Sequence, residues 1–262
     1  MIHEQFDPKL DSAIDELSLS YEDVMQLFDA ADALTRSYRL RASLTVPALR
    51  GETRAKIAEK LFAEHVSEKT TKALGICAQF AESTGALEDS VERQAVRGLL
   101  RHADNLATVQ DELFTVARMI RSNHDLLMTL RDPLIPIKAR QDLIATVFGD
   151  KCDSVTMTLI QRAVSTRHHT VVKNIESYVW VAAQIEHHKV AIVSVAHPLN
   201  SHQYQRMSAQ LQRIYGVGVD IQVRIDPHVI GGAKVEIDDD RIDGTIRKKL
   251  DDIRHQFGDD SQ

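Results

Sequence analysis

Hydrophobic residues in the first two-thirds of the chain recur every three or four positions, with polar residues between them. Leu27, Ala30, Ala31 and Leu34 stand at i, i+3, i+4 and i+7, which places them on one face of a helix. The same spacing returns in several later segments, up to about residue 188. Apolar stripes of this width are buried against other helices. We therefore expect helical bundles over this part of the chain.

The helical segments are duplicated along the sequence. When the chain is shifted on itself by 86 positions, so that Leu34 falls on Ile120, two stretches align without a gap. Self-similarity at a fixed interval predicts tandem structural copies. One copy is close to the lower size limit for independent stability, and the sequence leaves open whether the copies fold independently. The identical pairs include Leu27 and Leu113, Phe28 and Phe114, Pro47 and Pro133, Arg54 and Arg140, Phe62 and Phe148, and Thr70 and Thr156.

The pattern changes after a predicted connecting helix over residues 171–188. Val190 to Ala196 is dense in β-branched residues, which predicts a buried strand. Ser201 to Tyr215 returns to helical spacing, and Val219 to Ile225 alternates between apolar and polar residues, as in a half-buried strand. A further strand through Val235 and a final helix complete a β-α-β-β-α unit.

These patterns predict a mainly α N-terminal part, built as tandem helical bundles, followed by a small α+β domain. We place an extra N-terminal helical copy at residues 1–89, a helical domain with its connecting helix at 90–188, and the α+β C-terminal domain at 189–262. The content of 11 Gly, 6 Pro and 5% aromatic residues favours helices with aliphatic cores over a sandwich or barrel rich in turns.

Charge and composition exclude several classes of partner. The chain has 32 basic and 38 acidic residues, a net charge of −6, and no basic run, so we expect no nucleic-acid binding. No apolar run approaches the ~18 residues of a membrane span, and the acidic start is unlike a signal peptide. We therefore expect no direct membrane insertion. Cys77 and Cys152 form no Cys-x-x-Cys motif, which indicates reduced thiols.

The stretch from Ile225 to Phe257 carries the most specific motif. A turn at Asp226-Pro227 precedes the Gly231-Gly232 pair and a strand, and Asp243-Gly244 forms a corner into the last helix. Glycines at two corners predict positive φ or close backbone approach. The apolar face of the last helix is formed by Ile246, Leu250, Ile253 and Phe257. The stretch is typical of a folding unit that closes a sheet and docks a helix.

This stretch resembles the C-terminal signature of the ATP synthase delta subunit family, which includes the mitochondrial oligomycin-sensitivity-conferring protein. Resemblance to an ordinary bacterial member covers about residues 90–262. The preceding residues are similar to the extra upstream copy of the long delta subunits of actinobacteria. The matching residues, to which we assign a structural role, are Asp226, Pro227, Ile230, Gly231, Gly232, Val235, Ile237, Ile242, Asp243, Gly244, Thr245, Ile246, Arg247 and Leu250.

The resemblance implies a non-catalytic stator subunit of a proton-translocating ATP synthase. It implies that the helical domain holds the N-terminal helices of the α subunits and that the C-terminal domain binds the b-subunit peripheral stalk, with the β subunit as a further candidate partner. These contacts would resist rotor torque during ATP synthesis. The implied location is peripheral, on the cytoplasmic face of the plasma membrane, and no cofactor is implied. The sequence does not identify the residues that contact α or b, or the role of the extra copy.

The residues themselves support no catalytic, cofactor or metal site. The Gly231-Gly232 pair precedes a strand and lacks both phosphate-binding glycine patterns. A calcium loop starting at Asp239 would place Arg241 where an oxygen donor is required. The adjacent pairs His168-His169 and His187-His188 point about 100° apart on a helix and cannot easily share one metal ion.

Two other functions remain as alternatives. A helical adaptor outside the ATP synthase is compatible with the repeat alone, although the closing motif argues against it. A small-molecule enzyme would need a pocket with convergent polar groups, and no Ser, His and Asp arrangement stands out. Arg247, Lys248 and Lys249 are interpreted either as a solvated helix face or as the charged rim of a stalk contact.

Overall fold

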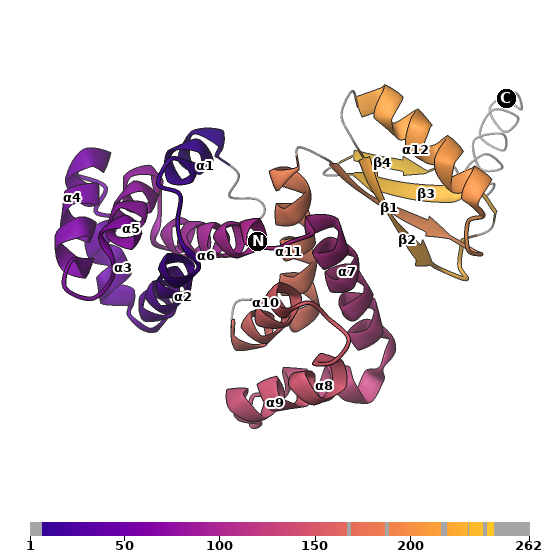
Figure 1. The fold of residues 1–262 in the computed structure, drawn as a ribbon, viewed down its shortest axis with the longest axis horizontal. Helices are drawn as coiled ribbons and strands as arrows, with labels where there is room; N and C mark the ends of the chain where they lie inside the picture. Colours follow the sequence, from indigo (N-terminus) through magenta and orange to yellow (C-terminus); the bar gives the residue numbers. More distant parts are fainter. Residues whose placement is uncertain are drawn as a thin grey trace, which may run out of the picture. The chain divides into compact units, whose positions relative to one another are not determined.

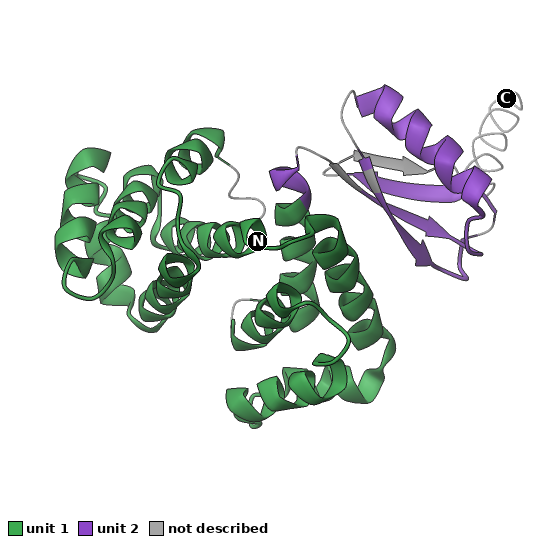
Figure 2. Cartoon of the chain, viewed as in Figure 1, with its two compact units in different colours: residues 1–182 green, residues 183–262 purple. Residues whose placement is uncertain are grey.

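The chain folds into two compact units, residues Met1–Ala182 and Ala183–Gln262 (Figure 2). The computed structural model describes residues 7–166, 169–186, 189–215, 219–229, 231–237 and 240–243, of which 189, 190, 220 and 240–243 are described by their backbone alone. Within these residues, unit 1 is helical and unit 2 combines a sheet with a helix (Figure 1).

Unit 1 is built from short and medium-length helices, most of which begin with a side-chain cap. Ser20, for example, accepts a hydrogen bond from the Asp23 N–H while the Asp23 carboxylate accepts one from the Ser20 N–H, which forms a capping box. The helices are α1 (Pro8–Asp15), α2 (Tyr21–Arg36), α3 (Tyr38–Leu44), α4 (Gly51–Phe62), α5 (Glu68–Phe80), α6 (Thr84–Arg101), α7 (Leu106–Ser122), α8 (His124–Arg131), α9 (Ile137–Phe148), α10 (Ser154–Ser165) and α11 (Val171–Ile185).

The helix bounds confirm the repeat. α4 begins at Gly51 and α9 at Ile137, and they end at Phe62 and Phe148, a shift of 86 positions at both ends (137 − 51 and 148 − 62). The same shift relates α2 to α7, α3 to α8, α5 to α10 and α6 to α11 to within two residues. The tandem helical copies predicted from the sequence are therefore present in the structure.

Buried positions and a polar contact are repeated between the copies as well. The Gln26 side chain accepts a hydrogen bond from the Ser67 N–H at the start of α5 (2.7 Å), and the Glu112 side chain accepts one from the Asp153 N–H at the start of α10 (2.9 Å). These contacts satisfy main-chain donors that a helix start leaves unpaired. Aligned buried pairs are Leu27 and Leu113, Ala31 and Ala117, Leu44 and Leu130, Phe62 and Phe148, and Thr70 and Thr156.

Helix α6 belongs to both copies. The shift of 86 positions places the whole of α6 on α11, and it places α1 (Pro8–Asp15) on residues 94–101, the second half of α6. α6 is thus the last helix of the first copy and the first helix of the second. Twelve of its 18 residues are buried, as expected of a helix with neighbours on several sides. The predicted boundary after residue 89 falls inside α6, and the three-region division stays a prediction.

Unit 2 is a small α+β fold. Its strands are β1 (Lys189–Val195), β2 (Val219–Ile225), β3 (Ala233–Ile237) and β4 (Asp240–Asp243), in the sheet order β2-β1-β3-β4. β1 and β2 are parallel, so their connection is a crossover through α12 (Ser201–Tyr215), whereas β3 pairs antiparallel with β1 and β4. The predicted fold class is confirmed, and the predicted final helix lies outside the described residues.

The core of unit 2 lies between α12 and one face of the sheet (Figure 1). Leu211 of α12 is 4% exposed and packs with side chains that alternate along the strands, the period expected of a sheet with one buried face. The strand residues of this core are Ala191, Val193, Val195, Val219, Ile221, Val235 and Ile237.

The turn of the C-terminal motif is held by hydrogen bonds of Asp226. The Asp226 N–H donates to the Val195 carbonyl (2.8 Å), and the Asp226 carboxylate accepts a hydrogen bond from the His228 N–H (2.9 Å). Gly231 and Gly232 have φ of 66° and 76°, the left-handed region that favours glycine. This confirms the predicted positive φ at that corner.

Helices α4 and α5 of the first copy approach each other closely at Gly51. A Cβ at Gly51 would lie 2.7 Å from the carbonyl oxygen of Gln79, and Arg54 Nη2 donates to the same oxygen at 2.9 Å. Because the obstructing atom belongs to the backbone of a helix, it cannot move aside cheaply. Only glycine allows this separation of the two helices.

Gly51→Ala should destabilise unit 1 by about 1–3 kcal/mol, because the new methyl group forces α4 away from α5. Gly85→Ala is the matched control, since nothing lies within 4 Å of a Cβ at Gly85; it should be neutral or stabilising by up to ~1 kcal/mol. Urea unfolding followed by fluorescence of Trp180, the one tryptophan, measures both. Equal midpoints for the two variants would contradict the close approach.

Gly232→Val should destabilise unit 2 by about 1–3 kcal/mol or more, because a β-branched side chain is strained at positive φ. Gly232→Asn tests the cause, since asparagine tolerates the left-handed region better and should lose less. Hydrogen exchange of the β1 and β3 amides reports on unit 2 specifically. Unchanged protection in the valine variant would show that the corner is not constrained.

Candidate functional site

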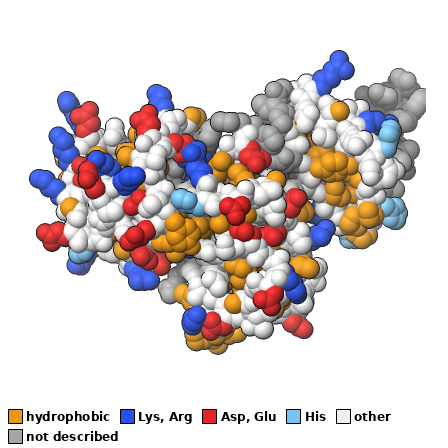
Figure 3. Space-filling model, viewed as in Figure 1, with side chains coloured by type: hydrophobic (Ala, Val, Ile, Leu, Met, Phe, Trp, Pro, Cys, Tyr) orange, Lys and Arg blue, Asp and Glu red, His pale blue; other side chains and the backbone are white. Residues whose placement is uncertain are grey.

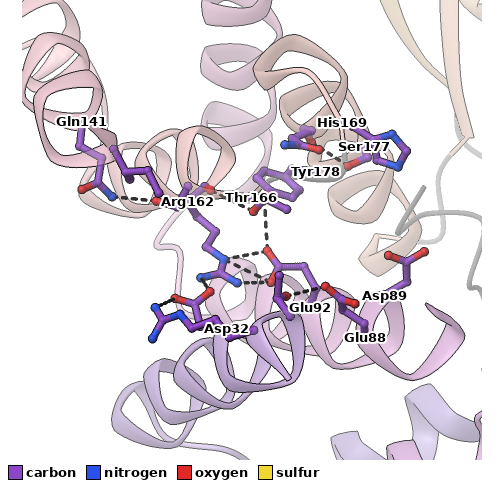
Figure 4. A pocket seen from close by; sticks show the side chains of 15 residues that line it. Asp32, Glu88, Asp89, Glu92, Gln141, Arg162, Thr166, His169, Ser177 and Tyr178 are labelled. Atoms are coloured by element: carbon purple, nitrogen blue, oxygen red, sulfur yellow. Dashed lines mark hydrogen bonds and ion pairs between the residues drawn. The ribbon is translucent and has the colours of Figure 1, made fainter. Parts of the chain in front are cut away.

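A group of paired charges lies where the two helical copies meet on α6. Arg162 of α10 places its guanidinium between two carboxylates: Nε and Nη2 donate to Glu92 of α6 at 2.8 and 2.5 Å, and Nη1 donates to Asp32 of α2 at 2.6 Å (Figure 4). Tyr178 of α11 donates its hydroxyl to Glu92 at 3.4 Å. We call these four residues, Asp32, Glu92, Arg162 and Tyr178, the α6 junction.

Burial and charge together fix the protonation states in the α6 junction. Burial lowers the pKa of Arg162, but the Glu92 and Asp32 carboxylates outweigh it and hold that pKa above the ordinary value. Burial, followed by the charge of Glu92, raises the pKa of Tyr178, so its phenol stays protonated as a donor. The Arg162 guanidinium also lies 5.0 Å from the centroid of the Phe28 ring, a favourable cation–π distance.

A second carboxylate of α6, one turn before Glu92, makes a parallel set of contacts. Glu88 accepts a hydrogen bond from the Thr35 hydroxyl at 2.5 Å and pairs with Arg41 of α3 at 3.1 Å. Its side chain is 6% exposed, so both partners are needed to offset the cost of burying the charge. Glu88 therefore ties α6 to the helices of the first copy.

The second half of α6 holds α1 by a ladder of arginine–aspartate pairs. Arg93, which is 0% exposed, binds Asp11 with two hydrogen bonds at 2.6 and 3.0 Å. Arg97 binds Asp15 in the same two-point manner at 3.0 and 2.9 Å. Planar two-point pairs of this kind fix orientation as well as distance. The ladder thus sets both the position and the rotation of α1 on α6.

A cavity of about 370 Å³ lies beside the α6 junction. Its two serine hydroxyls donate to main-chain carbonyls: Ser165 Oγ to that of Gln161 at 3.0 Å and Ser177 Oγ to that of Asn174 at 2.7 Å. A nucleophile would instead need a base as its hydrogen-bond partner. The arrangement is that of a structural joint made of paired charges.

The motif residues predicted from the sequence lie in unit 2, and they are distant along the chain from the residues of the α6 junction. Asp226 and Pro227 form the turn after β2, and Gly231 and Gly232 precede β3. In β4, Ile242 and Asp243 pair with Val235 and Lys234 of β3. Six further predicted residues, Ile230, Gly244, Thr245, Ile246, Arg247 and Leu250, lie outside the described residues.

No metal site is found among the residues that the structure describes. His168, His187 and His188 lie outside the described residues, and His169 is exposed beside the cavity at the α6 junction. Cys77 is buried and Cys152 half-buried, both as free thiols. Burial raises the pKa of the Cys77 thiol to about 12, so it is an inert part of the core rather than a reactive group.

The sequence analysis did not identify the α6 junction. A signal was present in the repeat: Arg162 aligns with Ile76 of the first copy (162 − 76 is 86), so a charge replaces an apolar residue beside the buried stripe. Glu92 aligns with Tyr178 under the same shift, and these two residues contact each other. Departures from the repeat therefore mark the residues that join the copies.

Comparison with known proteins identifies the family. The family model described as ATP synthase delta (OSCP) subunit matches residues 94–257. ATP synthase subunit delta of Cutibacterium acnes is 32% identical over 254 residues, which covers 95% of this chain and 97% of that protein. The same subunit of Streptomyces avermitilis is 33% identical over 258 residues, covering 95% and 93%. The subunit of Corynebacterium kroppenstedtii is 32% identical over 236 residues, covering 88% and 87%.

The relatives also contain a counterpart of the first helical copy. An alignment of 254 residues that covers 95% of this chain must include most of residues 1–89, so the extra copy is shared with relatives of similar length. The match of the family model begins in the second half of α6, near the start of the second copy. The chain belongs to the ATP synthase delta (OSCP) subunit family.

Proposed function

We propose that this chain is the non-catalytic stator subunit of a proton-translocating ATP synthase, which links the catalytic head to the peripheral stalk. The observation that carries the proposal is the family match over residues 94–257, together with near full-length relatives named ATP synthase subunit delta. The chain itself is structural, and the complex is the enzyme. Membership of this family favours the stator function over a helical adaptor outside the ATP synthase.

The proposed partners follow from the two kinds of unit. The helical copies bind the N-terminal helices of the α subunits, and the α+β unit binds the b subunit, with β as a further candidate. Grooves between amphipathic helices are suited to a partner helix. We propose that the chain is divided into three regions: the extra helical copy at 1–89, the helical domain at 90–188 and the α+β domain at 189–262.

A stator must transmit torque without deforming, and the α6 junction supports this role. α6 is bound to α1 through Arg93 and Arg97, to α3 through Glu88, and to α10 through Glu92. Two-point pairs of a guanidinium with a carboxylate fix orientation as well as distance. They hold these helices in one geometry around α6, which supports a unit that resists bending there.

The proposed location is the cytoplasmic face of the plasma membrane, as a peripheral part of the membrane-bound complex. Among the helices that the structure describes, none combines the length and apolar character of a membrane span. Attachment to the membrane therefore runs through partner subunits in this proposal, most directly through b.

Affinity capture of the tagged chain from detergent-solubilised membranes of its own cell tests the function. We expect the ATP synthase α and b subunits in the captured material, identified by mass spectrometry, because both are proposed to bind the chain directly. Membranes that have been washed to remove the catalytic head serve as the control and should lose α while retaining b. Recovery of neither subunit from unwashed membranes would refute the stator function.

Arg162→Met should destabilise unit 1 by about 3–5 kcal/mol, because Glu92 stays buried without its cation. Arg36→Met is the matched control: Arg36 also pairs with Asp32, but its side chain is 79% exposed, so the loss should be at most ~1 kcal/mol. The double variant Arg162→Met/Glu92→Gln removes both charges and should recover part of the loss. Urea midpoints measure all three, and an unchanged midpoint for Arg162→Met would contradict the role of the α6 junction.

A further inference from the structure

The second helical copy contains an open groove. Most of the residues that line it do not line the cavity beside the α6 junction. The groove has a volume of about 910 Å³. It lies between the α8–α9 connection with the start of α9 on one side and the end of α10 with the start of α11 on the other. Its apolar lining consists of Leu130, Pro133, Ile135, Pro136, Ile137, Val164 and Val171.

The groove exists because one residue differs between the copies. In the first copy, Gly51 lets α4 lie against the end of α5, and Arg54 donates to the Gln79 carbonyl there. In the second copy the position of Gly51 is taken by Ile137, whose side chain cannot fit that separation. Arg140, the counterpart of Arg54, donates instead to the Leu130 carbonyl of α8 at 3.0 Å. The start of α9 thus stays apart from the end of α10, and the groove opens between them.

Among the residues that the structure describes, the charged side chains lining the groove are those of Arg131, Arg140 and Lys173, and no Asp or Glu is among them, although the chain carries a net charge of −6. Elsewhere on unit 1, acidic and basic side chains are interspersed on the face shown in Figure 3. None of the three cations forms an ion pair with a described residue.

The apolar surface continues onto the lip of the groove. Leu134, between the lining residues Pro133 and Ile135, is 88% exposed, and Met128 on α8 is 52% exposed. The walls are helices and a proline-containing loop, and they offer no strand edge for pairing. A polypeptide bound here must satisfy its own backbone hydrogen bonds, which a helix does. An apolar floor with a cationic rim complements an amphipathic helix that carries carboxylates.

We propose that this groove binds an acidic amphipathic helix of a partner subunit in the ATP synthase. Apolar side chains of the helix pack against Pro133, Ile135 and Ile137, which are exposed or half-buried, and carboxylates on its flanks pair with Arg131 and Lys173. The inference rests on the proposed stator function and adds to it a specific surface and a specific partner chemistry. It also distinguishes the copies, since the first has Gly51, with its close approach of α4 to α5, where the second has Ile137.

The test measures binding of two labelled synthetic helices of about 18 residues to the full chain by fluorescence anisotropy. Both peptides carry Leu at i, i+3, i+4 and i+7, and the flanking positions are Glu in one and Lys in the other. The chain should bind the Glu peptide and discriminate against the Lys peptide. Arg131→Glu/Lys173→Glu should weaken binding of the Glu peptide about tenfold or more, because both rim charges become repulsive.

Two control variants separate the groove from general charge effects. Lys56→Glu/Arg118→Glu makes the same change in net charge at exposed positions outside the groove and should leave binding unchanged. Ile135→Ser removes a half-buried apolar side chain at the lip and should weaken binding several-fold, which a purely ionic ligand would not require. Equal binding of the Glu and Lys peptides would overturn the proposal.

Anionic lipid is the competing source of negative charge. If vesicles containing phosphatidylglycerol bind the chain and the Arg131→Glu/Lys173→Glu variant loses this binding, while the Glu peptide does not bind, the groove is a lipid site and the proposal is wrong. If the chain recovers α and b from membranes but fails to bind the Glu peptide, the groove proposal falls and the stator function stands. If neither α nor b is recovered, the stator function fails as well.

Discussion

Charged side chains buried on α6 constrain the rest of the helical unit. Glu88, Glu92, Arg93 and Arg97 are each at most 6% exposed, and an ion of this kind costs several kcal/mol to bury unless it is paired and hydrogen-bonded. Their partners come from α1, α3 and α10. These helices can therefore take only the few positions on α6 that bring the opposite charges within hydrogen-bond distance. The requirement ties together segments as distant in sequence as α1 and α10.

The repeat explains why one helix can hold both copies. Each copy needs a helix at its start and another at its end, and α6 fills both places, because the whole of α6 aligns with α11 and its second half aligns with α1. An added copy that shares a helix with its neighbour cannot move as a separate body on a linker. A duplicated unit of this design lengthens the protein while keeping it stiff, which suits a subunit that resists torque.

Much of the fold could be predicted from the sequence because helices and strands leave periodic patterns. The shift of 86 positions predicted paired helices, the alternation from Val219 to Ile225 predicted β2 with its observed bounds, and the Gly231-Gly232 pair predicted positive φ. The sharing of α6 cannot be read from its apolar pattern: its buried positions include the charged residues Glu92 and Arg93, so the pattern is that of a helix with one buried face. Hydrophobic periodicity cannot show that a charge is buried, because burial depends on a partner such as Arg162, 70 positions away in the chain.

The α6 junction was harder to predict than the fold, because it too depends on residues that are far apart in the chain. The family signature in unit 2 was recognisable from local order along the chain, whereas the α6 junction exists only when α2, α6, α10 and α11 meet. The groove of the second copy depends on a still smaller difference, Gly51 against Ile137, whose effect on helix separation is visible only in three dimensions. Departures from an internal repeat are the sequence signal that both features share.

The stator role is tested most directly by ATP-driven proton pumping in inverted membrane vesicles from cells that lack the chain. Without a stator, ATP hydrolysis turns the head instead of the rotor, so hydrolysis should proceed without acidification of the vesicle interior. Addition of the purified chain should restore acidification, measured with a pH-sensitive dye, at an unchanged rate of hydrolysis per head. Equal acidification with and without the chain would contradict the account.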